Sequence, residues 1–342
     1  SGQRIAVIGP LADSHADMNG TWSFFGEEQH TVTFLDGIRE VAGEENVSYA
    51  QGCDLYDDNT DGFRDAIRAA RASDVTVMVL GESAVMNGEA ASRSDIRIPE
   101  NQLALLEEIV SIGKPVVLMV MTGRPLDLSL PSEIVPAMMC VWTLGSESGH
   151  AAADVLFGDY NPSGKLPISF PRNVGQVPIY YNHPHTGRPY LGDYSEPASE
   201  RIYLSKYRDV KNSPLYPFGY GMSYTTFTYS DITLSADTVR QQGPITASVT
   251  VTNSGDRAGT EIVQLYIRDL QASVVRPVKE LKAFQKVELQ PGESKEVTFG
   301  LGPAKLAFFH SNLEKKPEAG EFQVFIGTNS DTDRFASFFY SE

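Results

Sequence analysis

The sequence predicts an α/β domain with a mostly parallel sheet, followed by an all-β domain of the immunoglobulin-like sandwich type. Two observations predict this order. In the first half, short β-rich apolar runs alternate with segments of helical period, a pattern typical of a parallel sheet covered by helices. In the second half, strand-like alternating runs follow one another between turn signals, which is typical of a β-sandwich.

The elements of the first half follow from these runs. The expected strands are 4–8, 47–50, 75–80, 116–121, 137–142 and 166–170. Between them, 62–72 and 99–112 have helical period, and Pro99 suits the first turn of the second helix. Ser146 and Glu147 start another helix that ends near residue 157.

The second half begins after a segment rich in Pro, Tyr, Gly and His. Expected strands there are 245–252, 261–267, 296–301 and 322–326. The composition of the preceding segment favours an ordered connector over a flexible Gly/Ser linker. We therefore expect an α/β domain at 1–172, a connector at 173–217 and a β-sandwich at 218–342.

Composition excludes several classes of function. The 342 residues include 44 Asp and Glu against 28 Lys and Arg, and this net charge of −16 opposes binding to nucleic-acid phosphates. No apolar run is long enough to span a bilayer. Cys53 and Cys140 lie far apart without metal-ligand spacing. The first turn, GPLADS, lacks the GxGxxG fingerprint, so dinucleotide binding is disfavoured.

The loop after the third expected strand is the longest and most charged of those at the ligand-binding edge. Parallel sheets bind ligands outside the carboxyl ends of their strands. This loop carries Glu82, Glu89, Arg93 and Asp95. Charged loops are more often simply solvated, and residue type alone hardly separates Glu89 from Glu82 as a catalytic acid. Glu82, which follows the strand directly, could instead bind the backbone of the loop.

Several stretches, in this order along the chain, resemble the C-terminal portion of glycoside hydrolase family 3, particularly its bacterial β-glucosidases. They are VIGPLADS, GESAVMNGEAASRSDI, KPVVLMVMTGRP, ADVLFGDYNPSGKLPISFP, YPFGYGMSYTTF and RPVKELKAFQKVELQPGES. The resemblance implies an enzyme of three parts: an N-terminal (β/α)8 barrel, an α/β sandwich and a fibronectin type III-like domain. It places the nucleophilic aspartate on the barrel and the general acid/base at Glu89, within GEAASRSD.

The same resemblance implies the substrate and the partners. We expect part of a retaining, exo-acting β-glucosidase that acts on a terminal β-linked glucose of a β-glucoside or oligosaccharide, in the periplasm or outside the cell. The barrel would be absent from this chain, which would then be inactive alone; the start at Ser1 without Met also suggests a missing upstream segment. A homodimer is left open. The alternative is a non-catalytic carbohydrate-binding or interaction module.

Other candidates carry weaker expectations. Arg93 and Asp95 are expected to order the loop as an ion pair that supports Glu89, with sugar-hydroxyl contact as the alternative. Arg124, in the TGRP motif, is interpreted as structural. Trp142 ends an apolar strand and is interpreted mainly as core, with a sugar platform as the alternative.

Metal and cofactor sites are not expected. His183 and His185 have a spacing compatible with metal binding, but the sequence offers no third ligand beside them. Asp13 follows the first strand, where it could reach the ligand edge or cap a short helix.

Overall fold

The structure, a computed structural model, describes residues 2–189 and 203–342 and divides into two compact units. The first unit comprises Ser1–Tyr160 and Pro171–Val177, and the second comprises Asn161–Phe170 and Pro178–Glu342. Part of the connector expected at 173–217 lies outside the described residues. The domain boundaries at 172 and 217 stay predictions.

The first unit contains a five-stranded sheet in the order β2-β1-β3-β4-β5. Every neighbouring pair in it is parallel. The chain extends the sheet from β1 first to β2 and then, on the other side, to β3, β4 and β5. The order therefore reverses between β1 and β3, which is the topological switch point where open α/β sheets bind ligands. The strands are β1 (Ile5–Ile8), β2 (Val47–Ala50), β3 (Val75–Gly81), β4 (Val116–Met121) and β5 (Ala137–Cys140).

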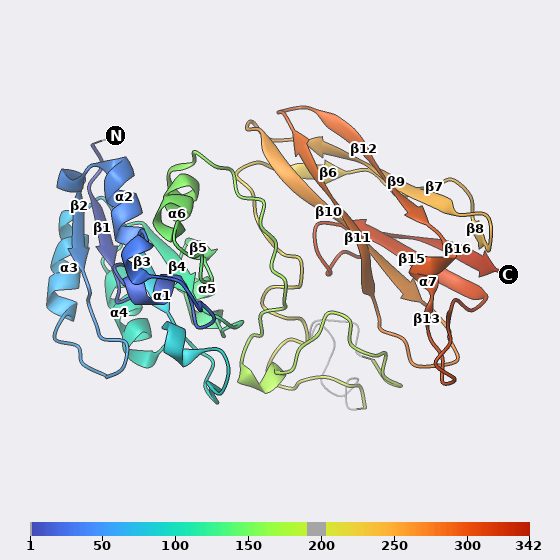
Figure 1. Cartoon of the computed structure of the whole chain (residues 1–342), viewed down its shortest axis with the longest axis horizontal. Helices are drawn as coiled ribbons and strands as arrows, with labels where there is room; N and C mark the ends of the chain where they lie inside the picture. Colours follow the sequence, from blue (N-terminus) through green and yellow to red (C-terminus); the bar gives the residue numbers. More distant parts are fainter. Residues whose placement is uncertain (1, 190–202) are drawn as a thin grey trace. The chain divides into compact units, whose positions relative to one another are not determined.

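Helices cover both faces of this sheet (Figure 1). Ile5 and Val7 of β1 pack into one core with residues of α2 and α6. On the opposite face, Leu105 of α4 and Ala66 of α3 pack against Gly52, which follows β2. The α-helices are α1 (His15–Met18), α2 (Phe34–Ala42), α3 (Phe63–Ala72), α4 (Glu100–Ser111), α5 (Ser129–Ile134) and α6 (Ser148–Phe157); the 3-10 turns are η1 (Glu28–His30), η2 (Glu44–Asn46), η3 (Ala84–Met86) and η4 (Val174–Gln176).

One expected strand of this sheet was wrong. Residues 166–170 form no strand, and Phe170 makes only an isolated antiparallel bridge with Tyr216 inside the second unit. The apolar alternation of this stretch resembled a strand, but Pro167 and Pro171 lack the backbone N–H that a ladder requires. The segment crosses to the second unit instead of extending the sheet.

The second unit contains a β-sandwich of two sheets. One has the order β11-β10-β15-β16-β8, and the other β12-β9-β6 with β7 also paired to β9. Inward residues of both sheets, among them Val249, Leu265, Phe299 and Val324, form one core. The strands are β6 (Phe227–Tyr229), β7 (Thr233–Leu234), β8 (Thr238–Arg240), β9 (Ile245–Asn253), β10 (Gly259–Asp269), β11 (Glu280–Leu289), β12 (Ser294–Leu301), β15 (Gly320–Gly327) and β16 (Phe335–Ser341); smaller elements are α7 (Pro303–Leu306), β13 (Phe308–Phe309) and β14 (Lys315–Lys316).

These observations confirm the predicted fold class of an α/β domain followed by an immunoglobulin-like sandwich. None of the helices in the described ranges is both long and apolar enough to cross a membrane.

Candidate active site

The charged loop of residues 82–98 begins at the switch point, directly after β3. Gly81 ends that strand with a φ of 137°, and a Cβ there would lie 1.9 Å from the Met121 carbonyl oxygen, so a glycine is required. The Gln102 amide of α4 accepts from Gly81 N at 2.8 Å and donates to Gly81 O at 3.0 Å. The start of the loop is therefore fixed by both a strand and a helix.

Glu82 is completely buried and is surrounded by donors. Arg93 Nη1 lies 2.8 Å from Glu82 Oε1, and Arg124 Nε lies 3.1 Å from Oε1 and 3.2 Å from Oε2. The Thr122 hydroxyl is 2.9 Å from Oε2. A buried carboxylate is tolerated only when charged groups and hydrogen bonds compensate its lost hydration. Both carboxylate oxygens of Glu82 therefore bind groups that hold the base of the loop together.

Arg124 extends this network to the backbone of the loop. Its Nη2 donates to the Met86 carbonyl at 2.5 Å and to the Ala91 carbonyl at 2.7 Å. Gly123, just before it, leaves room for Asn87, whose Oδ1 would lie 2.2 Å from an added Cβ. The TGRP motif therefore holds the charged loop directly through the bonds of Arg124 to two of its backbone carbonyls.

The loop after β1 holds the other side of the charged loop. The Thr21 hydroxyl lies close to the Ala84 carbonyl and 3.0 Å from the Asn87 carbonyl oxygen. Asp17, which is buried, accepts from Ala84 N at 2.6 Å. These contacts join the two loops across the switch point between β1 and β3. Sequence reasoning did not identify Asp17 or Thr21, since short polar residues after a strand carry no distinctive signal.

Glu89 lies at the turn of the loop and is exposed. Its side chain forms no hydrogen bond or ion pair with any residue in the described ranges 2–189 and 203–342. The next residue, Ala90, has a φ of 59°, the left-handed region that costs an L-residue about 1–2 kcal/mol. Backbone strain of this kind is concentrated at functional sites. Of the glutamates in the loop, Glu89 is therefore the one that can reach a ligand.

The expected pairing of Arg93 with Asp95 is not what the structure shows. Arg93 binds Glu82, whereas Asp95 binds the guanidinium of Arg97, with a shortest distance of 2.7 Å. Hydrogen bonds from the Arg97 side chain and backbone lower the pKa of Asp95 to about 2. Both residues of this exposed pair lie on the same loop, so Asp95 orders the loop locally. The pairing differs because Glu82 offers Arg93 a buried carboxylate and Arg97 is the nearer partner of Asp95.

Trp142 lies just past the end of β5 and is half-buried, with a φ of 44°. In the first unit, Ala90 and Trp142 are the residues other than glycine that have a left-handed backbone among those described. Both follow strands at the carboxyl edge. After Trp142 the chain approaches the loop after β1, where Gly145 N donates to Met18 O at 3.0 Å and Thr143 packs on Gly20.

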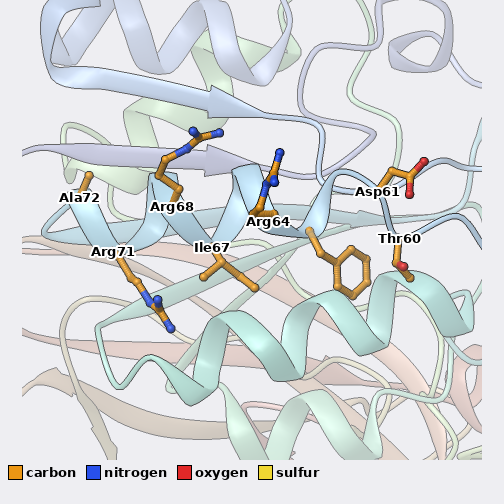
Figure 2. Close-up of a pocket in the computed structure, with 8 residues that line it drawn as sticks. Thr60, Asp61, Arg64, Ile67, Arg68, Arg71 and Ala72 are labelled. Atoms are coloured by element: carbon orange, nitrogen blue, oxygen red, sulfur yellow. The ribbon is translucent and has the colours of Figure 1, made fainter.

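Two further features of the first unit lie apart from these contacts. Asp13, His15 and Asp36 place their ligating atoms within 4.8 Å of one another. Within the fold, Asp13 accepts from the Thr33 hydroxyl and Asp36 completes the capping box of α2. A hollow along α3 is lined by three arginines and, among the described residues, one carboxylate, Asp61; its lining is Thr60, Asp61, Phe63, Arg64, Ile67, Arg68, Arg71 and Ala72 (Figure 2). It includes no residue of the charged loop.

His183 and His185 are exposed and belong to the second unit. His183 O accepts from Val278 N at 3.0 Å, and its ring Nδ1 lies 3.1 Å from the Pro184 carbonyl oxygen. In the described ranges, the only group of three potential metal-ligating side chains is that of Asp13, His15 and Asp36, and it does not include these histidines.

Comparison with known proteins gives two family matches. The glycosyl hydrolase family 3 C-terminal domain matches residues 1–224, and the fibronectin type III-like domain matches residues 261–330. These matches confirm the resemblance that the sequence motifs indicated.

Individual relatives agree with the family matches. The chain is 46% identical to a periplasmic beta-glucosidase of Salmonella typhimurium, over 98% of this chain and 46% of that protein. It is 40% identical to a beta-xylosidase of Formosa agariphila, over 96% of this chain and 44% of that protein. A crystal structure of a beta-glucosidase from Listeria innocua in complex with isofagomine matches with a TM-score of 0.91 and 40% identity, covering 99% of this chain and 46% of that one. The chain thus spans about half the length of the relatives it matches.

Proposed function

The chain belongs to glycoside hydrolase family 3, and on this premise we propose that it is the part of a retaining, exo-acting β-glucosidase that supplies the general acid/base, Glu89. One observation carries the proposal: the loop at the switch point exposes Glu89 without a partner in the described chain, while Glu82 is buried and fully engaged. An acid that transfers protons must be able to reach its substrate. Of the two glutamates in the loop, only Glu89 satisfies this requirement.

Retaining hydrolysis also needs a nucleophile. In this chemistry two carboxyl groups lie about 5–5.5 Å apart on opposite sides of the glycosidic bond. We propose that the second is an aspartate on a (β/α)8 barrel within the length of the relatives that this chain does not span. The aspartate attacks the anomeric carbon while Glu89 protonates the departing oxygen. Glu89 then removes a proton from a water molecule whose oxygen attacks the anomeric carbon; the bond to the aspartate breaks, and the sugar and the free aspartate are released.

The proposed substrate is a terminal β-linked glucose, and the proposed location is the periplasm or the exterior of the cell. Both rest on what the matched relatives are named: a periplasmic beta-glucosidase and beta-glucosidase crystal structures. A beta-xylosidase is also among the relatives, so xylosides belong in the same assay.

The decisive experiment substitutes Glu89→Gln in a full-length protein that contains this chain. Because the amide cannot donate an acidic proton, kcat/KM for an aryl β-glucoside with a poor leaving group should fall by about 10²–10⁴. A substrate with a good leaving group needs little protonation, so its loss in the first step should be much smaller. Glu108→Gln, on the exposed side of α4, is the matched control. Equal losses on both substrates would reject the general-acid role.

A second arm uses the chain by itself. Because a lone acid/base without its nucleophile cannot complete the double displacement, purified chain should release no nitrophenol from an aryl β-glucoside above background. Robust release from this chain would contradict the division of the two carboxyl groups between separate domains.

A further inference from the structure

The Arg124 side chain is bound at both ends of its guanidinium. Nε faces the Glu82 carboxylate, and Nη2 reaches the carbonyls of Met86 and Ala91. A guanidinium is planar and holds its donors in a rigid fork, so these bonds fix its orientation. An arginine held in this way acts as a rigid link between the buried base of the loop and its backbone.

The two carbonyls that Arg124 binds lie on either side of Glu89. Before Glu89, the backbone is also held by Thr21 and Asp17 through Ala84 and Asn87. After Glu89, Arg124 provides the side-chain hydrogen bond to the backbone at Ala91. The Glu89 side chain has no bond of its own to a residue in the described ranges, so its direction is set by this backbone. Loss of the Arg124 clamp would release the C-terminal side of the turn.

Glu82 offsets the energetic cost of burying the Arg124 guanidinium. A guanidinium that is 20% exposed needs compensation for its lost hydration, and the Glu82 carboxylate supplies it. Arg93 binds the same carboxylate at 2.8 Å. Both cations therefore lie at the base of the loop, and neither forms an ion pair with Glu89 in the described chain.

We propose that Arg124, anchored on Glu82, is a positioning residue that sets the turn from Met86 to Ala91 and thereby directs Glu89 toward the glycosidic oxygen. The inference rests on the proposed function of Glu89. Its mechanical part, the clamp on the turn, can be measured without catalysis.

The first measurement is amide hydrogen exchange of residues 86–93 in this chain. Arg124→Lys keeps the positive charge but lacks the fork that reaches both carbonyls and the carboxylate. Exchange in this segment should become at least about tenfold faster, because the turn opens more often. Arg97→Lys, which disturbs only the exposed pair with Asp95, is the control and should leave exchange unchanged. Thr122→Val removes the hydroxyl that lies beside Glu82, and gives a milder test if Arg124→Lys does not fold.

The second measurement is kinetic and uses the full-length protein. Arg124→Lys should lower kcat/KM for a poor leaving group by about 10²-fold, since small displacements of a catalytic group have effects of that size. For a good leaving group the loss should be much smaller. Combining Arg124→Lys with Glu89→Gln should add little to the loss caused by Glu89→Gln alone, because both act on one proton transfer.

The outcomes separate the inference from the function on which it rests. Unchanged exchange in both Arg124→Lys and Thr122→Val overturns the inference, whatever the kinetics. Faster exchange with an unchanged ratio of activities on the two leaving groups also overturns it, because the clamp would then not act through Glu89. Failure of the proposed function shows separately, as equal losses on both substrates in Glu89→Gln with Arg124 intact.

Discussion

Glu82 and Glu89 share a loop and a residue type but have opposite environments. Glu82 is inaccessible and contacts two guanidinium groups and a hydroxyl. Glu89 is exposed, forms no bond to another described residue, and precedes a residue with a left-handed backbone. The difference shows that one carboxylate holds the loop together and that the other is accessible from the solvent. Stability should therefore depend on Glu82 and hardly on Glu89, whereas activity should depend on Glu89 directly and on Glu82 through the loop that it holds.

The largest expected effect on stability comes from Glu82→Gln. Removing this charge leaves Arg93 and Arg124 without their buried counter-ion, which typically costs about 3–5 kcal/mol. Both tryptophans, Trp22 and Trp142, lie in the first unit, so tryptophan fluorescence during urea unfolding reports on that unit. Glu89→Gln is the matched control and should change the free energy of unfolding by less than about 0.5 kcal/mol. Similar losses for both variants would remove the distinction.

A smaller effect is expected at Ala90. Because glycine adopts a positive φ without steric cost, Ala90→Gly should relieve about 1–2 kcal/mol of strain and lose part of it to the entropy of the unfolded chain. The net result should be a gain of up to about 1 kcal/mol in the free energy of unfolding. Ala91→Gly, whose φ is not positive, should instead destabilise. If both substitutions destabilise equally in urea unfolding, the turn beside Glu89 is not strained.

The smallest effect concerns Asp95, a third carboxylate on the loop that is both exposed and paired. Arg97 lowers its pKa to about 2 in the folded state, below the unfolded value of about 3.9. The folded state therefore binds this proton less tightly, and the pair stabilises the fold above about pH 4 and loses its effect as the pH falls toward 2. Because both side chains are about half exposed, we expect less than about 1 kcal/mol.

Urea unfolding from pH 2 to pH 6 checks this prediction. In Asp95→Asn the acid-dependent part of the stability that belongs to this pair should be absent, while the remaining pH dependence persists. Identical pH profiles for the two proteins would show that the pair contributes nothing measurable.

The sequence predicted the fold class well because its signals are periodic and local. Five of the expected strands of the first half are present in the parallel sheet, since apolar runs bounded by turns have few alternatives. The strand predicted at 166–170 was wrong because prolines interrupt its alternation of apolar and other residues. Strand β11 was not predicted either; its first seven residues, 280–286, are partly or fully exposed on both faces and show no clear period.

The site was less predictable than the fold. Residue type could not distinguish Glu82 from Glu89, because burial depends on where Arg124, on a different strand end, places its guanidinium. The predicted ion pair of Arg93 and Asp95 was wrong for the same reason. The two residues are close in sequence, but the fold places Arg93 against the buried carboxylate of Glu82. Motif resemblance selected Glu89, and its exposed, unpaired state supports that selection.

The hydrogen bonds that the charged loop makes with Thr21 and Asp17 also limit how this site could be re-engineered. In a chimaera that takes only residues 82–98 from a relative, the incoming loop would meet residues after β1 and a TGRP turn from a different parent. Its backbone would then lack the matching partners for these hydrogen bonds. The transferable module is therefore discontinuous: the loop after β1, the loop after β3 and the TGRP turn. Laboratory recombination of this family should retain more active progeny when those three segments are inherited from one parent.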